Sequence, residues 1–479
     1  MGSSVASTPL HGTPGAGGTV GSTAATSRPA RRWRIGWVPL LAWSLPAVLA
    51  LLLIDPFGNR QTVLLGRVFA VLIIAQCGWV FWTHGGRRIS APGAYSAAML
   101  GFGGYAGWWW TSHTAGVELT TIVRAMIVLY VVQVLTYAFF WHDTTHEQVH
   151  LTRWKSADPA VRAVSRWGTQ LGLLLTVAGI AVATIDGFTT TLGSTTAYVG
   201  LALASAGLAA RGGGQVRWYA ALLIGVLLLA FITFAFEGYG RLNIVALLLV
   251  PAVVYSMFEN RRRMKIITLV GAPFAVVVLN AIRRNAVIAE RGAFDSTEIG
   301  STESPLQFFA KLLANQGNYA HAHGESILGS MLILVPRAVW PGKPVGFGTN
   351  LTEIYSPELL AVGHTYAGLS LGELYYNFGW LGLGMAVLLL GPLIRWVDRL
   401  GTWFAEGLAP TRSSLLKLVA VVLVIAGMPD LAWNGSSTFA SRAGFRVTLA
   451  LLLLLLLTQS SLTTPRRTRT TGARRVGRR

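Results

Sequence analysis

The chain has 479 residues, of which 53% are hydrophobic and only 12% are charged. Because soluble proteins carry about 25% charged residues, this composition excludes an ordinary soluble domain. The net charge of +20 would favour a nucleic-acid partner in a soluble protein. Here the cations lie in short loops and tails between apolar runs, so we expect membrane lipids as partners and no nucleic acid.

Apolar runs of near-spanning length recur along the whole chain. They cover residues 36–54, 62–82, 93–111, 119–140, 168–186, 193–210, 216–236, 242–258, 264–282, 366–393, 414–429 and 438–458. The predicted fold class is therefore all-α: a polytopic integral membrane protein with about 12 transmembrane helices.

The termini and the gaps between runs divide the chain into five parts. Residues 1–32 are rich in Ser, Thr, Gly and Ala and lack an apolar h-region, so they are expected to form a disordered cytoplasmic tail and not a signal peptide. The other predicted parts are helices 1 to 9 in 33–282, an extracytoplasmic functional loop at 283–365, helices 10 to 12 in 366–459, and a basic cytoplasmic tail at 460–479. The single cysteine, Cys77, excludes an intrachain disulfide.

Lys and Arg residues predict the orientation. If the chain crosses the membrane twelve times, most of the Lys and Arg residues fall on one side. The positive-inside rule assigns that side to the cytoplasm, and both termini lie on it. These cations lie within 28–34, 87–88, 153–166, 211–217, 261–265, 395–417 and 466–479. The outer side should be poor in cations, yet it includes Arg241, Arg283, Arg284, Arg291, Lys311, Arg337 and Lys343. All of these except Arg241 lie in one long segment, which is usual for a functional loop.

That long segment has structural signals of its own. Ser304, Pro305 and Gln307 form a helix start with a capping box, and an apolar face follows, so an amphipathic helix is expected against the bilayer surface or the helical bundle. Residues 326–335 are too short to span and predict a re-entrant or interfacial element. The three prolines in 336–344 predict a stiff turn that holds Arg337 and Lys343.

The outer cations are candidates for binding an anion. Arginine pairs bidentately with phosphate and keeps its charge at any working pH. Arg241, Arg283, Arg284, Arg337 and Lys343 would together suit a pyrophosphate at the membrane surface. The alternative is that they only extend to lipid headgroups.

Glu373 lies within the apolar run 366–393, where a carboxylate is costly unless it is paired or faces water. It is a candidate general base, with an interhelical ion pair as the alternative. His364, just before this run, is a second candidate base. Tyr376 and Asn377 suit either sugar contacts or helix packing.

Residues 146–150 read HEQVH, a zinc-protease pattern in which two histidines bind the metal and Glu147 serves as the base. The segment is predicted to lie in a cytoplasmic loop among charged residues, and no third-ligand motif follows it. Two further motifs are missing: the chain has no Asp-x-Asp or Asp-Asp pair for a metal–nucleotide clamp and no phosphate-binding loop of the ATPases. We therefore expect no cofactor and no metal.

Three elements between 236 and 395 resemble the O-antigen polymerase family of Wzy-type oligosaccharide repeat-unit polymerases. They are FEGYGRLN with NAIRRN, the LVPRAVWPGKP stretch, and GELYYNFGWLG. The N-terminal half agrees with the family only in hydropathy and helix count. The HEQVH element belongs to no family pattern that we associate with these enzymes.

This resemblance implies a metal-independent membrane glycosyltransferase of the GT-C type on the outer face of the cytoplasmic membrane. Its donor and acceptor would be oligosaccharides linked to polyprenyl pyrophosphate, and its protein partners a flippase and chain-length regulators. Arg241, Arg283 and Arg284 would hold the carrier, Arg337 and Lys343 would belong to the functional loop, and Glu373 to the acceptor side. The alternatives left open are an O-antigen-type ligase, a lipid-linked glycan flippase or exporter, and an HExxH zinc membrane protease.

Overall fold

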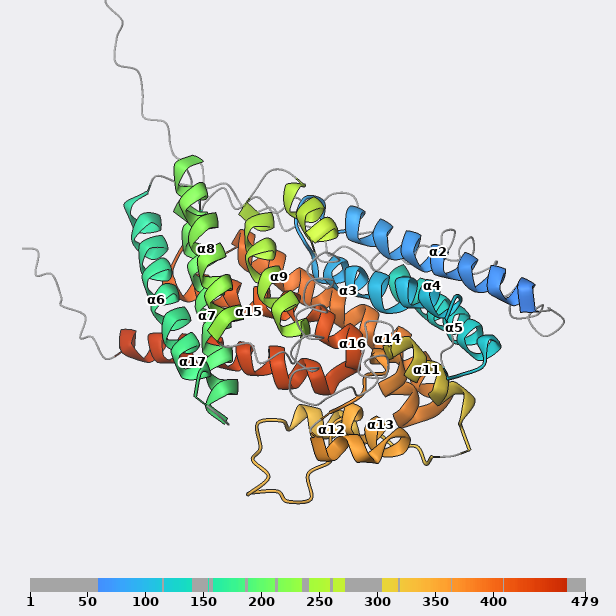
Figure 1. The fold of residues 1–479 in the computed structure, drawn as a ribbon. Coiled ribbons are helices and arrows are strands. Elements are labelled where there is room, and N and C mark those ends of the chain that lie inside the picture. Colours follow the sequence, from blue (N-terminus) through green and yellow to red (C-terminus); the bar gives the residue numbers. More distant parts are fainter. Residues whose placement is uncertain are drawn as a thin grey trace, which may run out of the picture. The chain divides into compact units, whose positions relative to one another are not determined.

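The structure is a computed structural model of the chain. It describes residues 59–113, 116–139, 154, 158–185, 188–211, 214–234, 241–258, 262–271, 304–317, 319–362, 364–407 and 409–462. All of these belong to one compact unit, Ile35–Arg479. Within the described ranges every regular element is helical (Figure 1), so the predicted all-α class is confirmed there.

The first described helices follow the predicted runs closely. Helix α2 (Asn59–Thr83) packs against α3 (Ala91–Met99) and α5 (Leu119–Ala138). Between α3 and α4 (Ala106–Trp110) the helix passes through a π-helical turn, η1 (Leu100–Tyr105). Helix α3 starts where the sequence dictates, because the Ser90 hydroxyl accepts a hydrogen bond from the Gly93 N–H at 3.1 Å and Pro92 occupies the first turn.

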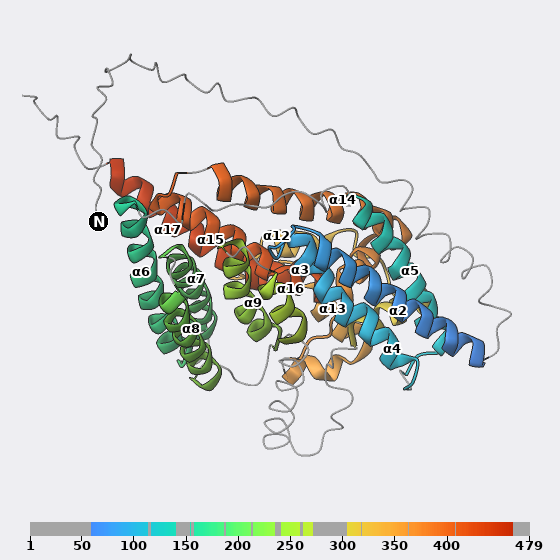
Figure 2. The same ribbon diagram turned by 90° about the horizontal axis from the view of Figure 1, so that it is seen from above.

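Helices α6 (Pro159–Ala183) and α7 (Phe188–Arg211) form a closely packed antiparallel pair, visible side by side in Figures 1 and 2. Their backbones meet at glycines spaced seven residues apart, Gly172 and Gly179 on α6 and Gly193, Gly200 and Gly207 on α7. Small residues allow membrane helices to approach to backbone contact. The predicted run 168–186 starts too late, because α6 begins at Pro159 with a polar first half capped by Asp158.

Gly200→Ala is therefore expected to separate this helix pair. The added methyl group would overlap the backbone nitrogen of Thr176 and the carbonyl oxygen of Gly172, neither of which can rotate away. Such overpacking costs about 1–3 kcal/mol, measured as a lower midpoint of thermal unfolding in detergent. Gly225→Ala in α8 is the matched control, because nothing lies within 4 Å of its added Cβ. Equal midpoints for the two variants would contradict the close packing.

Helices α8 (Gly214–Phe234) and α9 (Arg241–Phe258) agree with the predicted runs 216–236 and 242–258. Helix α9 packs against α7 and against α15 (Arg412–Ala426). The predicted run 264–282 is described only as far as residue 271, and the run 36–54 and the two tails lie outside the described residues, apart from the last helical turn up to residue 462.

The segment 304–362 contains α11 (Ser304–Ala314), α12 (Glu325–Met331), α13 (Phe347–Tyr355) and the 3-10 helix η4 (Pro357–Val362). The predicted amphipathic helix is confirmed as α11. It packs against the bundle, on α5 and α14, with Leu306, Phe309 and Leu312 fully buried. Helices α12 and α13 both pack against α16 (Figure 1).

Helices α14 and α17 extend beyond the C-terminal ends of the predicted runs, whereas α15 ends three residues before the end of the predicted run 414–429. Helix α14 runs from Leu369 to Gly407 with a break at Gly379. Helix α16 (Met428–Phe439) occupies the predicted gap after the run 414–429 and continues through a π-helical turn, η5 (Ala440–Gly444), into α17 (Phe445–Leu462). The predicted boundary was wrong because Asp430 interrupts the apolar pattern without ending the helix; the break in helical geometry comes at Asn434 and Gly435.

Six helices among the described residues are long and apolar enough to cross a membrane. They are Arg60–Thr83, Leu119–Ala138, Pro159–Ala183, Thr191–Arg211, Leu369–Phe404 and Met428–Leu457. Helix α9 is apolar but shorter, and α3 is divided from α4 by the π-helical turn. These long apolar helices indicate a membrane protein.

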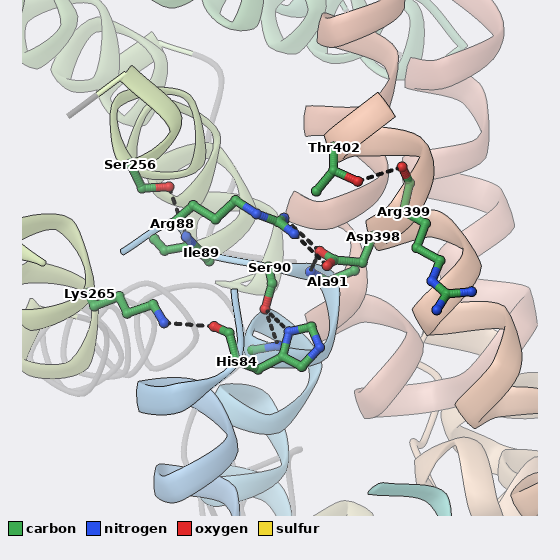
Figure 3. Close-up of polar contacts among 11 residues, drawn as sticks. His84, Arg88, Ile89, Ser90, Ala91, Ser256, Lys265, Asp398, Arg399 and Thr402 are labelled. Atoms are coloured by element: carbon green, nitrogen blue, oxygen red, sulfur yellow. Dashed lines mark hydrogen bonds and ion pairs between the residues drawn. The ribbon is translucent and has the colours of Figure 1, made fainter. Parts of the chain in front are cut away.

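A buried ion pair joins the turn after α2 to α14 (Figure 3). Arg88 donates two hydrogen bonds to the Asp398 carboxylate, at 2.7 and 2.5 Å, and the side chains are 3% and 6% exposed. The Lys265 ammonium lies nearby and donates to the backbone carbonyls of Trp82 and His84, at 3.1 and 2.8 Å. Arg88 was predicted as a loop cation, but it is a buried anchor between distant segments.

Candidate functional site

The centre of the candidate site is the break in α14. Gly379 has φ 59° and ψ −142°, a conformation that is essentially restricted to glycine. A break frees the carbonyl groups of the preceding turn from their helical partners. The Tyr376 carbonyl accepts from the Ala322 N–H at 3.2 Å, and the Asn377 carbonyl accepts from the His323 N–H at 3.0 Å. The NFG part of the GELYYNFG element thus fixes residues 321–324 to α14.

Asn377 extends this connection through its side chain, which is fully buried. Its amide oxygen accepts from the Gly324 N–H at 3.0 Å. Its amide nitrogen donates to the Ser326 hydroxyl at 2.8 Å and to the Glu373 carbonyl at 2.7 Å. Asn377 therefore holds the start of α12 against α14, which is the packing role considered for it.

Glu373 is 2% exposed and meets a second helix break. Helix α16 leaves helical geometry at Asn434 and Gly435, which frees backbone N–H groups. The Glu373 carboxylate accepts from the Ser436 N–H, from the Ser436 hydroxyl at 2.8 Å, and from the Ser326 hydroxyl at 3.4 Å. The costly carboxylate in a membrane helix is thus held by three donors, and it caps the second half of α16.

Gly435 is required by this arrangement. Its φ of +74° disfavours a side chain, and an added Cβ would overlap the Glu373 carboxylate. The two breaks, at Gly379 and Gly435, lie on adjacent helices and face the same segment through Ser326 and residues 321–324. Breaks of this kind in membrane helices occur where protein or a cavity satisfies the backbone.

Arg337 and Lys343 lie in the predicted proline-rich turn. The Lys343 ammonium is buried and donates to the carbonyls of Val335 and Ile333, at 2.9 and 3.3 Å, so it caps the end of the α12 region. Arg337 is exposed and donates to the Lys343 carbonyl at 3.1 Å. The turn is confirmed, and only Arg337 of this pair presents its charge at the surface.

The remaining predicted residues surround the α14 break or precede it. Tyr376 is 9% exposed and packs on Phe347 and Tyr319, with ring centroids 5.7 and 5.6 Å apart. Burial raises the pKa of the Tyr319 phenol well above its usual value. His364 lies between η4 and α14, against the ring of Tyr366 at 5.3 Å.

The predicted carrier-binding arginines are only partly placed. Arg241 is the first residue of α9. Arg283 and Arg284 lie outside the described residues, and so does the HEQVH segment. Among the residues that the structure does describe, no group of three or more His, Cys, Asp or Glu is arranged to hold a metal ion.

A second charged group, within a helix apolar enough to span a membrane, was not predicted from the sequence. Asp430 is fully buried and accepts from the Arg442 guanidinium at 2.8 Å. Arg446 lies 3.9 Å from the other Asp430 oxygen and donates to the Asn243 side chain of α9 at 3.0 Å. The signal was available: two arginines four residues apart interrupt the apolar run 438–458, and charges inside such runs mark functional positions.

Comparison of the chain with protein-family models, with curated proteins and with solved structures finds no match.

Proposed function

We propose that this protein is a metal-independent membrane glycosyltransferase that polymerises oligosaccharide repeat units linked to polyprenyl pyrophosphate. The reaction takes place on the outer face of the cytoplasmic membrane. The chain crosses that membrane about 12 times with both termini in the cytoplasm, and 283–365 forms the extracytoplasmic loop with its re-entrant element.

The observation that carries this proposal is the position of Glu373. It belongs to the GELYYNFG element, one of the most specific parts of the family resemblance. In the structure it lies at the junction of two broken helices and the segment 304–362. A buried carboxylate in such a junction is a typical functional residue of a membrane protein. The GELYYNFG element is therefore both a main part of the family resemblance and the place where the buried polar contacts of the described fold converge.

The reaction needs a cation site for the leaving group and a base for the acceptor. The acceptor hydroxyl oxygen forms a bond to the anomeric carbon of the donor glycan, and the bond from that carbon to the pyrophosphate oxygen breaks. The hydroxyl proton passes to Glu373, with His364 as the second candidate, and the bonding pair leaves on the lipid pyrophosphate. Fixed cations stabilise the departing charge, an effect often worth several kcal/mol.

Arg241, Arg283 and Arg284 supply the carrier-binding cations in this proposal, and Arg337 adds an exposed charge on the loop. Arginine suits this role because its planar fork pairs with two phosphate oxygens at once. Tyr376 contacts the sugar, while Asn377 and Lys343 hold the surrounding backbone. The acceptor and donor both enter from the bilayer with their lipid tails.

Arg241→Ala and Arg283→Ala are expected to abolish long chains while leaving single-repeat glycan, because the leaving group loses a fixed cation. The chain-length distribution of glycan from cells that carry each variant measures this. Arg263→Ala is the control, because Arg263 is exposed on the side predicted to be cytoplasmic and should leave chain length unchanged. Long chains persisting in both arginine variants would reject these roles.

A further inference from the structure

The charged group around Asp430 is built from three separate elements. Asp430 comes from α16, Arg442 from the π-helical turn η5, and Arg446 from the first turn of α17. Because Arg442 and Arg446 are four residues apart, they lie on one face of the helix. Asn243 of α9 contacts Arg446 at 3.0 Å. π-Helical turns within longer helices are frequent at functional sites.

The charges of this group do not balance. Two guanidinium groups face one carboxylate, so the group carries one net positive charge inside a helix that is long and apolar enough to span a membrane. Arg446 Nη1 is buried and donates no hydrogen bond among the described residues; it faces Asp430 Oδ2 at 3.9 Å, which is within ion-pair range but beyond hydrogen-bond distance. A buried guanidinium that does not use all its N–H groups is unfavourable. The excess positive charge and the unused N–H of Arg446 therefore favour an anion with hydrogen-bond acceptors.

The two arginines differ in a way that suits such a ligand. The Arg446 side chain is 5% exposed and its guanidinium carbon lies 3.7 Å from the ring centroid of Tyr198, which fixes its plane. The Arg442 side chain is 26% exposed and is reachable from outside the bundle. The orientation of the Arg446 guanidinium is therefore fixed before a ligand binds, and the Arg442 guanidinium is accessible to the ligand. The N-terminus of α9, two residues before Asn243, adds a favourable dipole for an anion.

We infer that Arg442 and Arg446 form an oxyanion site that binds phosphate oxygens of a diphosphate. The chemistry is that of a diphosphate ester, whose several acceptor oxygens match two guanidinium forks. The source of that diphosphate, a polyprenyl carrier in the bilayer, rests on the proposed function. Asp430 keeps Arg442 oriented and leaves the net charge of the site positive.

The test uses the purified full-length chain in lipid nanodiscs with three probes: a polyprenyl diphosphate, the corresponding polyprenol, and inorganic pyrophosphate. Binding is measured as the ligand-dependent shift in thermal unfolding. We expect the polyprenyl diphosphate to bind much more tightly than the polyprenol. Arg442→Ala should weaken it by about tenfold to a hundredfold, the loss expected for a hydrogen bond to a charged group. Arg263→Ala, an exposed arginine elsewhere, should leave the affinity unchanged.

Arg442→Lys is a second variant in case Arg442→Ala fails to fold, because it keeps a positive charge beside Asp430. It loses the bidentate contact of the guanidinium, so it should also weaken binding. Affinity equal to the unaltered chain in both Arg442→Lys and Arg446→Lys would overturn the site. If inorganic pyrophosphate bound as tightly as the lipid diphosphate, the site would still bind oxyanions. The inference that its ligand is a lipid diphosphate would then be wrong. Because the assay involves no glycan transfer, a chain that binds the diphosphate but makes no polymer would refute the proposed function alone.

Discussion

Asp398→Ala is expected to be among the most destabilising single substitutions in the described fold. It leaves the Arg88 guanidinium, whose side chain is 3% exposed, without its carboxylate. Breaking a buried ion pair from one side costs about 3–5 kcal/mol, because the remaining charge stays buried. The variant also removes the acceptor for the Ala91 N–H at the start of α3. The expected result is a large fall in the thermal unfolding midpoint and in the yield of folded protein.

The double variant Arg88→Met with Asp398→Leu is the matched control. It removes both charges and fills the space with apolar groups, so it should recover much of the lost stability. Figure 3 shows why the pair is a structural anchor: the turn 84–91, α14 and Lys265 converge there. A double variant as unstable as Asp398→Ala, or a single variant as stable as the unaltered chain, would show that the pair does not anchor these segments.

Glu373→Ala is expected to abolish polymer formation. It removes the proposed base, whose contribution is typically about 10²–10⁴-fold in rate. It also leaves the Ser436 and Ser326 donors without their acceptor, which costs about 1–3 kcal/mol and weakens the junction between α14 and α16. Chain length in cells and thermal unfolding of the purified variant measure the two effects separately.

Glu373→Gln separates chemistry from structure. The amide has nearly the same volume and keeps one acceptor oxygen for the Ser436 N–H, and the hydroxyls of Ser436 and Ser326 can turn to accept from its N–H groups. It cannot take a proton from the acceptor sugar. We expect the folded protein to persist and long chains to be lost. If Glu373→Gln made polymer at the rate of the unaltered chain, Glu373 would be only the cap of the broken helix.

The helices were predictable wherever apolar composition alone decides them. The runs 62–82 and 119–140 correspond to α2 and α5 within three residues at each end. The start of α11 was readable from Ser304 and Pro305. The start of α6 was not, because its first half is polar and amphipathic, and a search for apolar runs ignores such residues.

The candidate site was predictable one residue at a time but not as an arrangement. Glu373 stands out in the sequence because a carboxylate is rare in an apolar run. Its partners Ser326 and Ser436 lie 47 and 63 residues away, and serine is too common to signal such a contact. The conformations of Gly379 and Gly435 are also invisible to hydropathy, because glycine is ordinary in membrane helices.

Lys343 was predicted to bind an anion because it lies on the outer side, but in the structure it holds nearby backbone. Its ammonium is engaged by the carbonyls of Ile333 and Val335, which only the folded turn brings together. Arg442 and Arg446 lie inside the apolar run 438–458, so a count of cations by loop does not include them. Their signal in the sequence is a charge within an apolar run.

The most direct measurement is to incubate the purified chain with a synthetic oligosaccharide repeat unit on polyprenyl pyrophosphate and to separate the products by size. We expect a ladder whose steps differ by one repeat unit, formed without added metal or nucleotide and lost in Glu373→Gln. A donor that stays unchanged, or a single transfer to a different acceptor with no ladder, would contradict the proposed function.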